Sequence, residues 1–393
     1  MKTYVIERAG GPDVLKLVDL PSPEPKADEV RIRVRAFGLN RAEVYFRSGK
    51  MGAITGPRVP GIEAVGEIIS DPSGSFRTGQ RVATAMGGMQ FSRNGSYAEE
   101  VAVLRSNVVD LQGTTLSWEE LAALPESFLT AWGALAKSLT IRKGQTLLVR
   151  GATAAVGLAS VVYAKTLGVR VVATTRSEQN TARLREVGAD ITLVDDGQIA
   201  DDVRRAVPEG VDAALEVVGA ATVRDTLEAL KPFGAVTVIG LLGGPPVLEN
   251  LDLMQELPGA TRLSFFQGYV LGTAALPLTD APLKSLADGI AKGRVPSLLT
   301  KTFDFDQVPR AHAFMESDRD SGRTWCVSDL HRLNLRSDRN LSNGLPRIAI
   351  ACFYQSEATG LQQQFLTRCR SPLTGFVCWE RPNDAAASST RER

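Results

Sequence analysis

The sequence has few cysteines and histidines, which argues against both a zinc site and a disulfide framework. The first 325 residues contain no cysteine, and the four cysteines (Cys326, Cys352, Cys369 and Cys378) all lie beyond Trp325. None has Cys-x-x-Cys spacing, and the chain holds only two histidines, so we expect no zinc site. A disulfide framework would conflict with an intracellular protein.

Charge bias and long apolar runs are also absent. The chain has 45 basic and 44 acidic residues and a formal net charge of +1, which gives no indication of a nucleic-acid or membrane-surface partner. No run approaches the length of a membrane span, and Met1–Arg8 lacks the apolar core of a signal peptide. We therefore expect a soluble, cytoplasmic protein whose 393 residues are enough for two domains.

The most informative stretch reads as strand, small-residue turn, helix and strand. Thr146–Val149 is a short apolar run of the kind buried in parallel sheets, and it leads into Gly151-Ala-Thr-Ala-Ala-Val-Gly157. A helix then runs to about Leu167, before Gly168, and Arg170–Thr174 forms the second strand. This order predicts a dinucleotide-binding unit, with the pyrophosphate on the amides that open the helix. The candidate cofactor ligands in the turn are Gly151, Ala154, Ala155, Val156 and Gly157.

The residues after the second strand favour one nicotinamide cofactor over the other. NAD sites usually place Asp or Glu here, whereas this strand ends in Thr175 and Arg176, and the first carboxylate is Glu178. A guanidinium binds a 2′-phosphate through charge-assisted hydrogen bonds, so the sequence predicts NADPH. The alternative is that Arg176 is only a solvated arginine. Ala154 replaces the middle glycine of the usual pattern, and its methyl group narrows the approach to phosphate.

The order of elements along the chain predicts an α/β fold joined to a β domain. Ser117 and Glu120 form a capping box that opens the first helix before the nucleotide domain. Before it, the pattern is mostly β, with predicted strands at Glu29–Phe37, Ala64–Ile69, Gln80–Ala83 and Tyr97–Val103. After it, strands at Ile191–Val194, Val211–Val217 and Ala235–Gly240 alternate with helices, among them Val223–Leu230. This alternation indicates a doubly wound parallel sheet.

Four segments together carry a family resemblance. They are Gly38-Leu-Asn-Arg-Ala-Glu-Val-Tyr-Phe-Arg-Ser-Gly49, Pro60-Gly-Ile-Glu-Ala-Val-Gly66, Leu124-Pro-Glu-Ser-Phe-Leu-Thr-Ala-Trp-Gly-Ala134 and the Gly151–Gly157 turn. Over about residues 1–324 the chain resembles the zinc-independent quinone oxidoreductases of the medium-chain dehydrogenase/reductase superfamily.

The resemblance implies a GroES-like β-barrel domain (1–120) with an inserted Rossmann domain (121–265) and a return to the first domain (266–324). We expect residues 325–393 to form a disordered tail, because their composition is polar and irregular and shows no periodicity.

The resemblance also implies the chemistry. Zinc relatives have a cysteine where this chain has Asn40 and a histidine where it has Ile62, so metal-free hydride transfer from NADPH to a quinone or an α,β-unsaturated carbonyl is expected. Family likeness puts Asn40 near the nicotinamide ribose, Tyr45 in the substrate pocket and Thr130 against the cofactor phosphates or nicotinamide. Gly240 and Leu241 end a strand at the nicotinamide pocket, and a homodimer is expected.

Several alternatives stay open at this point. Tyr45 either contacts the acceptor or packs at the domain edge, and Arg47 either binds cofactor phosphate or pairs with Glu43. His312 is a surface or helix-packing residue. The whole protein is alternatively a trans-acting enoyl reductase of polyketide assembly, or a protein that binds NADPH without turnover.

Overall fold

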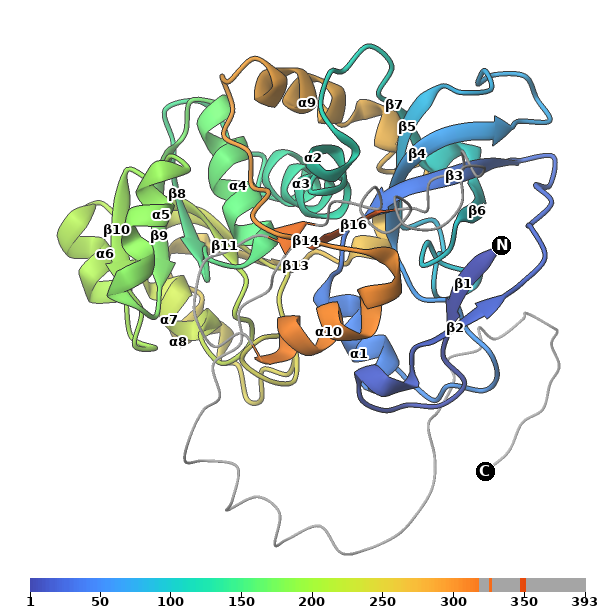
Figure 1. The fold of residues 1–393 in the computed structure, drawn as a ribbon. Coiled ribbons are helices and arrows are strands. Elements are labelled where there is room, and N and C mark those ends of the chain that lie inside the picture. Colours follow the sequence, from blue (N-terminus) through green and yellow to red (C-terminus); the bar gives the residue numbers. More distant parts are fainter. Residues whose placement is uncertain (318–324, 327–346, 351–393) are drawn as a thin grey trace, which may run out of the picture. The chain divides into compact units, whose positions relative to one another are not determined.

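The computed structural model describes residues 1–317, 325–326 and 347–350 (Figure 1). The elements up to the second helix are β1 (Lys2–Val5), β2 (Lys16–Asp19), β3 (Glu29–Phe37), α1 (Arg41–Arg47), β4 (Glu63–Ser70), β5 (Arg81–Ala85), β6 (Glu100–Leu104), β7 (Val108–Asp110) and α2 (Trp118–Ala122). The alternating unit then contains α3 (Pro125–Trp132), β8 (Thr146–Arg150), α4 (Ala155–Thr166), β9 (Arg170–Thr175), α5 (Thr181–Glu186), β10 (Ile191–Val194), α6 (Ala200–Ala206), β11 (Val211–Glu216), α7 (Val223–Glu228), β12 (Leu230–Val238), α8 (Leu253–Glu256) and β13 (Arg262–Phe265). The remaining elements are α9 (Leu283–Ala291), β14 (Thr302–Phe303), α10 (Val308–Ser317), β15 (Trp325–Cys326) and β16 (Arg347–Ile350).

The first domain is built on an antiparallel sheet centred on β3. This strand alternates apolar and arginine side chains, so Val30, Ile32 and Val34 are buried in the core of the domain. It pairs with β4 and β6, and β5 and β7 extend the sheet beyond β4. The capping box predicted at Ser117 is confirmed: its hydroxyl accepts the Glu120 N–H at 3.2 Å, and α2 begins there.

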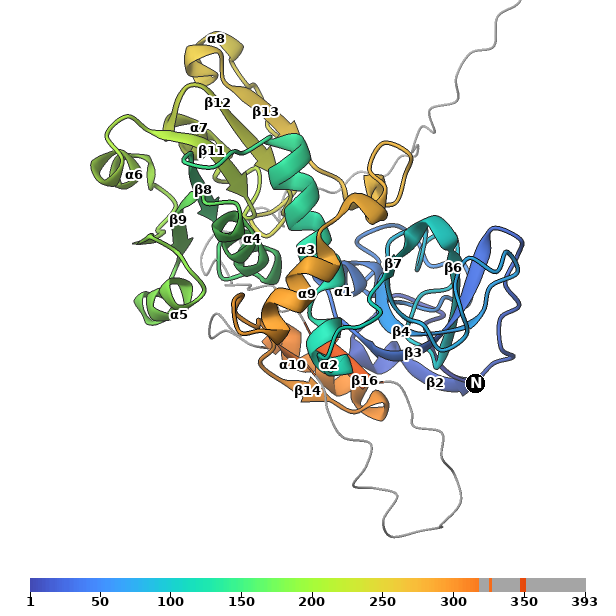
Figure 2. The same ribbon diagram turned by 90° about the horizontal axis from the view of Figure 1, so that it is seen from above.

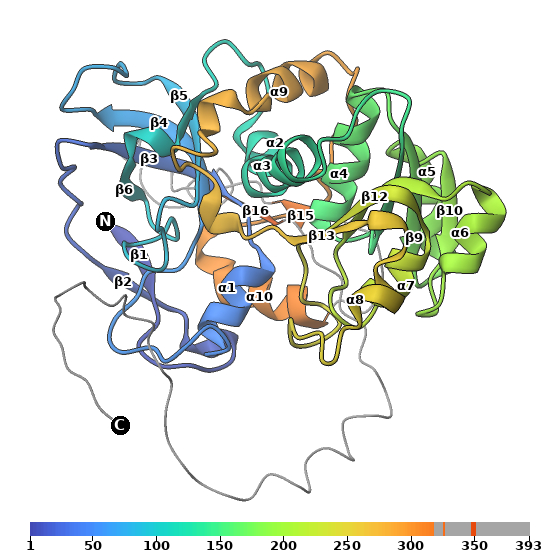
Figure 3. The same ribbon diagram turned by 180° about the vertical axis from the view of Figure 1, so that it is seen from behind.

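The last helix of the described chain returns to this first domain. Figures 1 and 3 show α10 beside α1, and the two helices are joined by an ion pair between Arg47 and Glu316 (2.6 Å). Near them, Phe305 packs edge-on against Tyr4 and Phe37. The segment after the Rossmann domain therefore helps to build the core of the β domain.

Two short segments of the tail that we expected to be disordered are strands. β15 pairs antiparallel with β16, and β16 pairs with β14 and runs parallel to β3, where Arg347 and Ile348 lie opposite Ala36 and Phe37. The disorder prediction is therefore wrong for these six residues, because β16 pairs with the end of β3 that lies beyond its pairing with β6. The rest of that prediction lies outside the described residues.

The second domain is a parallel six-stranded sheet in the order β10-β9-β8-β11-β12-β13. Successive side chains of each strand enter different cores: Leu147 and Val149 of β8 face the cluster that includes α3, α4 and α5, whereas Leu148 faces α6 and α7. Figure 2 shows α3 and α4 on one side of the strands and α6 and α7 on the other. The predicted doubly wound sheet is confirmed, and the carboxyl ends of its strands are where ligands of such sheets bind.

Candidate active site

The turn after β8 has the geometry of a pyrophosphate-binding loop. Gly151 has φ +77°, in the region that favours glycine, and a Cβ added at Gly157 would lie 2.7 Å from the Gly151 carbonyl oxygen. α4 begins directly after Ala154, whose methyl side chain has no oxygen to cap the first turn. Uncapped amides at the start of a twelve-residue helix suit an anionic group, so the residues present fit a dinucleotide. The Ala154 N–H itself closes the turn on the Gly151 oxygen (3.1 Å).

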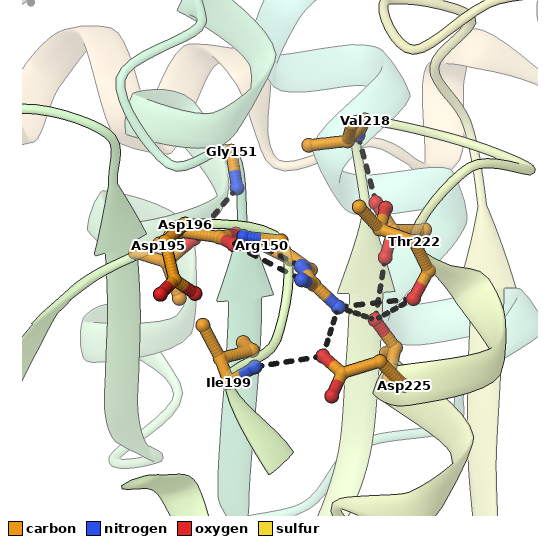
Figure 4. Close-up of polar contacts among 12 residues, drawn as sticks. Arg150, Gly151, Asp195, Asp196, Ile199, Val218, Thr222 and Asp225 are labelled. Carbon is orange, nitrogen blue, oxygen red and sulfur yellow. Dashed lines mark hydrogen bonds and ion pairs between the residues drawn. The ribbon is translucent and has the colours of Figure 1, made fainter.

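A buried arginine holds this turn from beneath (Figure 4). Arg150, the last residue of β8, is fully buried and donates from Nε and Nη2 to Asp195 (2.8 and 3.0 Å) and from Nη1 to Asp225 (2.6 Å). Asp195 also accepts the Thr174 hydroxyl (3.2 Å), whose oxygen accepts the Gly151 N–H (3.0 Å). The ends of β8, β9 and β10 are therefore tied to the first residue of the turn. Our sequence reasoning missed this residue, although an arginine between a buried strand and the glycine turn already required buried carboxylate partners.

The end of β9 places the predicted cofactor-selecting residues at the expected edge of the sheet. Thr175 is buried, and its hydroxyl oxygen accepts the Ser177 N–H (3.2 Å), which shapes the loop. Arg176 follows it and is exposed. The residues at this position therefore fit a 2′-phosphate better than a ribose hydroxyl, and the assignment of Arg176 stays a prediction.

The ends of β11 and β12 approach each other too closely for a side chain. A Cβ at Gly240 would lie 1.6 Å from the Val217 carbonyl oxygen, and Gly219, at φ +113°, faces Gly240 in the same way at 2.7 Å. Leu241 follows this contact and is half-buried. The two glycines thus let the strand ends meet beside the cofactor edge, where Gly240 and Leu241 remain predicted cofactor contacts.

The predicted catalytic residues of the β domain lie on or beside α1. Asn40 begins the helix, is 1% exposed and donates from Nδ2 to Glu63 Oε1 at 2.8 Å. Tyr45 is half-buried on the same helix, and burial raises the pKa of its hydroxyl. The Lys50 ammonium lies 5.5 Å from the centre of the Tyr45 ring.

Arg47 requires a correction. It is 0% exposed, and its guanidinium donates to the Gly10 carbonyl oxygen and to Glu316 (both 2.6 Å). The sequence alternatives were a cofactor phosphate or an ion pair with Glu43. The structure instead gives Arg47 an internal role that joins α1 to α10, because both terminal nitrogens are occupied inside the domain.

His312 is a packing residue rather than a surface one. It is fully buried on α10, and its Nε2 lies 3.0 Å from the Tyr97 hydroxyl. Burial, with Arg47 and Arg41 nearby, lowers the pKa of its imidazole to about 3. It is therefore neutral at physiological pH and stabilises the core of the β domain.

A chain of hydrogen bonds joins Thr130 to Asn40 through two glutamates to which the sequence analysis gave no role. The Thr130 hydroxyl donates to Glu126 (3.1 Å), the Glu126 N–H donates to Glu63 (2.8 Å), and Glu63 accepts from Asn40. Glu126 was recognisable from its position four residues before Thr130, a spacing that places both on one helix face. Glu63 follows Ile62 in the second of the four family segments, and it links the two domains through Asn40 and Glu126.

The described part of the chain offers neither a metal site nor a membrane-spanning helix. Within residues 1–317 and the two short tail strands, no group of three or more His, Cys, Asp or Glu side chains is arranged to hold a metal ion. None of the described helices is long and apolar enough to cross a bilayer.

Family models match both domains. The model for the alcohol dehydrogenase GroES-like domain matches residues 26–131, and the model for zinc-binding dehydrogenases matches residues 155–273. A GroES-like domain with an inserted Rossmann sheet is the architecture of medium-chain dehydrogenases and reductases, so the predicted fold class is confirmed.

Relatives narrow this class. Human quinone oxidoreductase is 30% identical over 318 residues, which are 79% of this chain and 93% of that protein. Quinone oxidoreductase of Pseudomonas aeruginosa is 29% identical over 328 residues, 80% of this chain and 96% of the relative. The chain belongs to the quinone oxidoreductase family of the medium-chain dehydrogenase/reductase superfamily.

Solved structures agree in fold. A mycobacterial quinone oxidoreductase is 28% identical with a TM-score of 0.72 and covers 84% of this chain and 100% of its own. A mycobacterial protein solved in complex with NADPH is 26% identical with a TM-score of 0.69, and the match covers 89% of this chain and 99% of that protein's chain.

Proposed function

We propose that this protein is an NADPH-dependent reductase that transfers a hydride to a quinone or an α,β-unsaturated carbonyl without a metal ion. The observation that carries the proposal is the end of β9, where Thr175 and the exposed Arg176 stand in place of the carboxylate that would select NADH. The relatives named above, including one solved with NADPH, support the same reading.

The cofactor half of the site would be assembled by the Rossmann domain. The amides of Ala155, Val156 and Gly157 would bind the pyrophosphate, and Arg176 would bind the 2′-phosphate. When bound, NADPH supplies a hydride. The Arg150 network fixes the turn in advance, so that little conformational entropy is lost on binding.

The acceptor half would be supplied by α1 and α3. Tyr45 offers a ring against which a flat acceptor stacks, or a hydroxyl that donates to a carbonyl oxygen as charge develops there. Asn40 is held by Glu63 and would position the nicotinamide ribose, and Thr130 and Leu241 would line the nicotinamide pocket. Ile62, 2% exposed, offers no metal ligand at the position where zinc relatives have histidine.

Two further expectations accompany this function. We propose that the protein works in the cytoplasm, since its composition gives no sign of a membrane or nucleic-acid partner. We also propose a homodimer, as the family resemblance implies.

Binding of the two cofactors tests the proposal directly. Titration calorimetry with NADPH and NADH should show tighter binding of NADPH. The Arg176→Ser variant should lose about 1.5–3 kcal/mol of the binding free energy of NADPH, which raises its Kd roughly 10–150-fold. NADH affinity should not change. Arg170→Ser, an exposed arginine at the opposite end of β9, is the matched control and should bind both cofactors like the wild type. Equal affinity of the wild type for NADH and NADPH would contradict the assignment.

A further inference from the structure

Three glutamates from three different elements meet at the junction of the two domains. Glu43 lies on α1, Glu63 begins β4 and Glu126 lies in the first turn of α3. Glu63 accepts the Asn40 side chain on one oxygen and the Glu126 N–H on the other, both at 2.8 Å. Glu43 accepts the N–H groups of Asn40 and Ile62. Both carboxyl oxygens of Glu43 and both of Glu63 therefore accept hydrogen bonds.

The Glu126 carboxyl group is the least satisfied of the three. Its Oε1 accepts the Thr130 hydroxyl at 3.1 Å, whereas its Oε2 is closed off from solvent and has no hydrogen-bond partner among the described residues. A buried carboxylate oxygen without a donor is costly, and a neutral carboxylic acid avoids the charge. A hydroxyl rotates to suit its neighbours, so a protonated Glu126 can donate to Thr130 Oγ1 while Thr130 donates onward.

The surroundings favour the protonated state. Burial raises the pKa of Glu126 to about 7, and burial together with the charge of Glu126 raises that of Glu63 to about 8. Burial and the charge of Glu63 also hold the pKa of Glu43 well above its usual range. The Tyr97 hydroxyl, ahead of β6, also faces this cluster, and the charges of Glu43 and Glu63 help to raise its pKa. At neutral pH the cluster therefore keeps protons that exposed glutamates would have lost.

We propose that Glu126 is the proton source of the reduction and that Thr130 delivers its proton to the carbonyl oxygen of the acceptor. This inference rests on the proposed function and names the proton donor for it. As the acceptor gains a hydride, which carries two electrons, from NADPH, its oxygen becomes negative. The Thr130 O–H bond breaks as an O–H bond forms on the acceptor. The Glu126 O–H bond then breaks to restore the Thr130 hydroxyl.

Each turnover takes up one proton from solvent. A quinone that gains one hydride and one proton becomes a hydroquinone, and an enone becomes an enol that tautomerises to the saturated ketone. The Glu126 carboxylate takes a proton from water before the next turnover. Glu63 accepts the Glu126 backbone N–H and so helps to hold Glu126 in place, and neither Glu63 nor Glu43 transfers a proton in this mechanism.

The first test measures the protonation state of the Glu126 carboxyl group without any turnover. Infrared titration of the cofactor-free protein should show a carboxylic acid band that disappears with a midpoint near pH 7. This component should be missing in Glu126→Gln and present in Glu228→Gln, the matched control at an exposed position on α7. A wild-type protein in which no carboxyl group titrates near neutral pH would overturn the proposal.

The second test uses the pH dependence of kcat. The wild type should lose kcat above about pH 7 as Glu126 ionises. Glu126→Gln should lower kcat by about 10²–10⁴-fold and remove this limb of the profile, with the Kd of NADPH unchanged. Thr130→Ser should keep the limb and Thr130→Val should lose it, which a purely structural role of the hydroxyl would not produce.

The outcomes separate this inference from the function on which it rests. An active wild type whose Glu126→Gln variant keeps both kcat and the alkaline limb contradicts the relay alone. A folded wild type that reduces no quinone or enone contradicts the proposed function and the relay with it.

Discussion

The side chains of Arg150 and Asp195 form a two-pronged ion pair inside the Rossmann domain, with Nε–Oδ2 and Nη2–Oδ1 distances of 2.8 and 3.0 Å. Both residues are buried, and the pair lies directly beneath the glycine turn (Figure 4). Because Asp195 also accepts from Thr174, which holds the Gly151 N–H, the ion pair supports both the fold and the cofactor loop.

Replacing Arg150 should therefore be costly. Arg150→Met leaves the buried Asp195 and the half-buried Asp225 without their cation, and removal of one partner of a buried pair costs about 3–5 kcal/mol. Arg150→Lys keeps the charge but not the planar fork, so its loss should be smaller. Urea unfolding measures both variants. An Arg150→Met protein within about 1 kcal/mol of the wild type would contradict this role, given the usual cost of such a loss.

The close approach at Gly157 gives a second prediction. A methyl group there would lie 2.7 Å from the Gly151 oxygen and 2.8 Å from the backbone of Ala152, neither of which can rotate away. Gly157→Ala should lower the free energy of unfolding by about 1–3 kcal/mol and weaken NADPH binding, because the turn has to shift. Thermal unfolding and calorimetry test the two effects. A variant with unchanged Tm and Kd would show that the turn tolerates the methyl group.

The buried carboxyl groups predict how stability changes with pH. The pKa of Glu63 rises from 4.5 in the unfolded chain to about 8 in the folded one, so the folded state holds a proton that the unfolded state has lost. The stabilisation from this proton is complete below about pH 4.5 and disappears as pH rises to 8. One such group changes stability by at most about 1.4 kcal/mol per pH unit, and Glu126 acts in the same direction.

Glu63→Gln should flatten this dependence. Urea unfolding at pH 5 and pH 8 should show a smaller loss of stability for the variant than for the wild type, whereas Glu228→Gln, at an exposed position, should follow the wild type. At pH 5 the variant should be less stable than the wild type, since one amide cannot accept hydrogen bonds from both Asn40 and Glu126. Parallel curves for variant and wild type would refute the assignment of a raised pKa to Glu63.

The proposed dimer is tested at the edge of the Rossmann sheet. β13 is the last strand of the described sheet, and Phe265 on it is 44% exposed, with Tyr269 nearby 67% exposed. An edge strand is a ready surface for pairing with a second chain, and these two aromatic side chains add apolar area to it. Light scattering should give twice the 42.2 kDa of the chain, and Phe265→Lys should shift the population towards the monomer. A wild type that is monomeric at micromolar concentration would contradict the dimer.

Much of the fold could be predicted because local pattern and tertiary role agree. The strand predicted at Glu29–Phe37 has these bounds in the structure, as its alternation matches a sheet with one buried face. Ile191–Val194 was likewise placed correctly. The predicted strand Ala235–Gly240 was wrong at both ends, since β12 runs from Leu230 to Val238. Its start contains Pro232 and Gly234, residues that a sequence pattern assigns to a turn.

The candidate site was less predictable, because its contacts join residues far apart in the chain. Nothing local indicates that Arg47 pairs with Glu316, 269 positions away, so the sequence offered only a cofactor phosphate or the nearer Glu43 as its partner. The Asn40–Glu63 contact likewise depends on how α1 packs against β4. Gly151 and Gly157 could be assigned, by contrast, since their requirement is one of backbone conformation within a single turn.

The central claim is tested most directly by following the hydride. Purified protein should be given NADPH carrying deuterium at C4 with a panel of quinones, enones and enoyl thioesters, and the products analysed by mass spectrometry. The account predicts that quinones or enones take up one deuterium for each NADPH consumed, in metal-free buffer, and that NADH supports a much lower rate. Turnover of enoyl thioesters alone would favour the enoyl reductase of polyketide assembly. A folded protein that binds NADPH but transfers no deuterium to any acceptor would contradict the account.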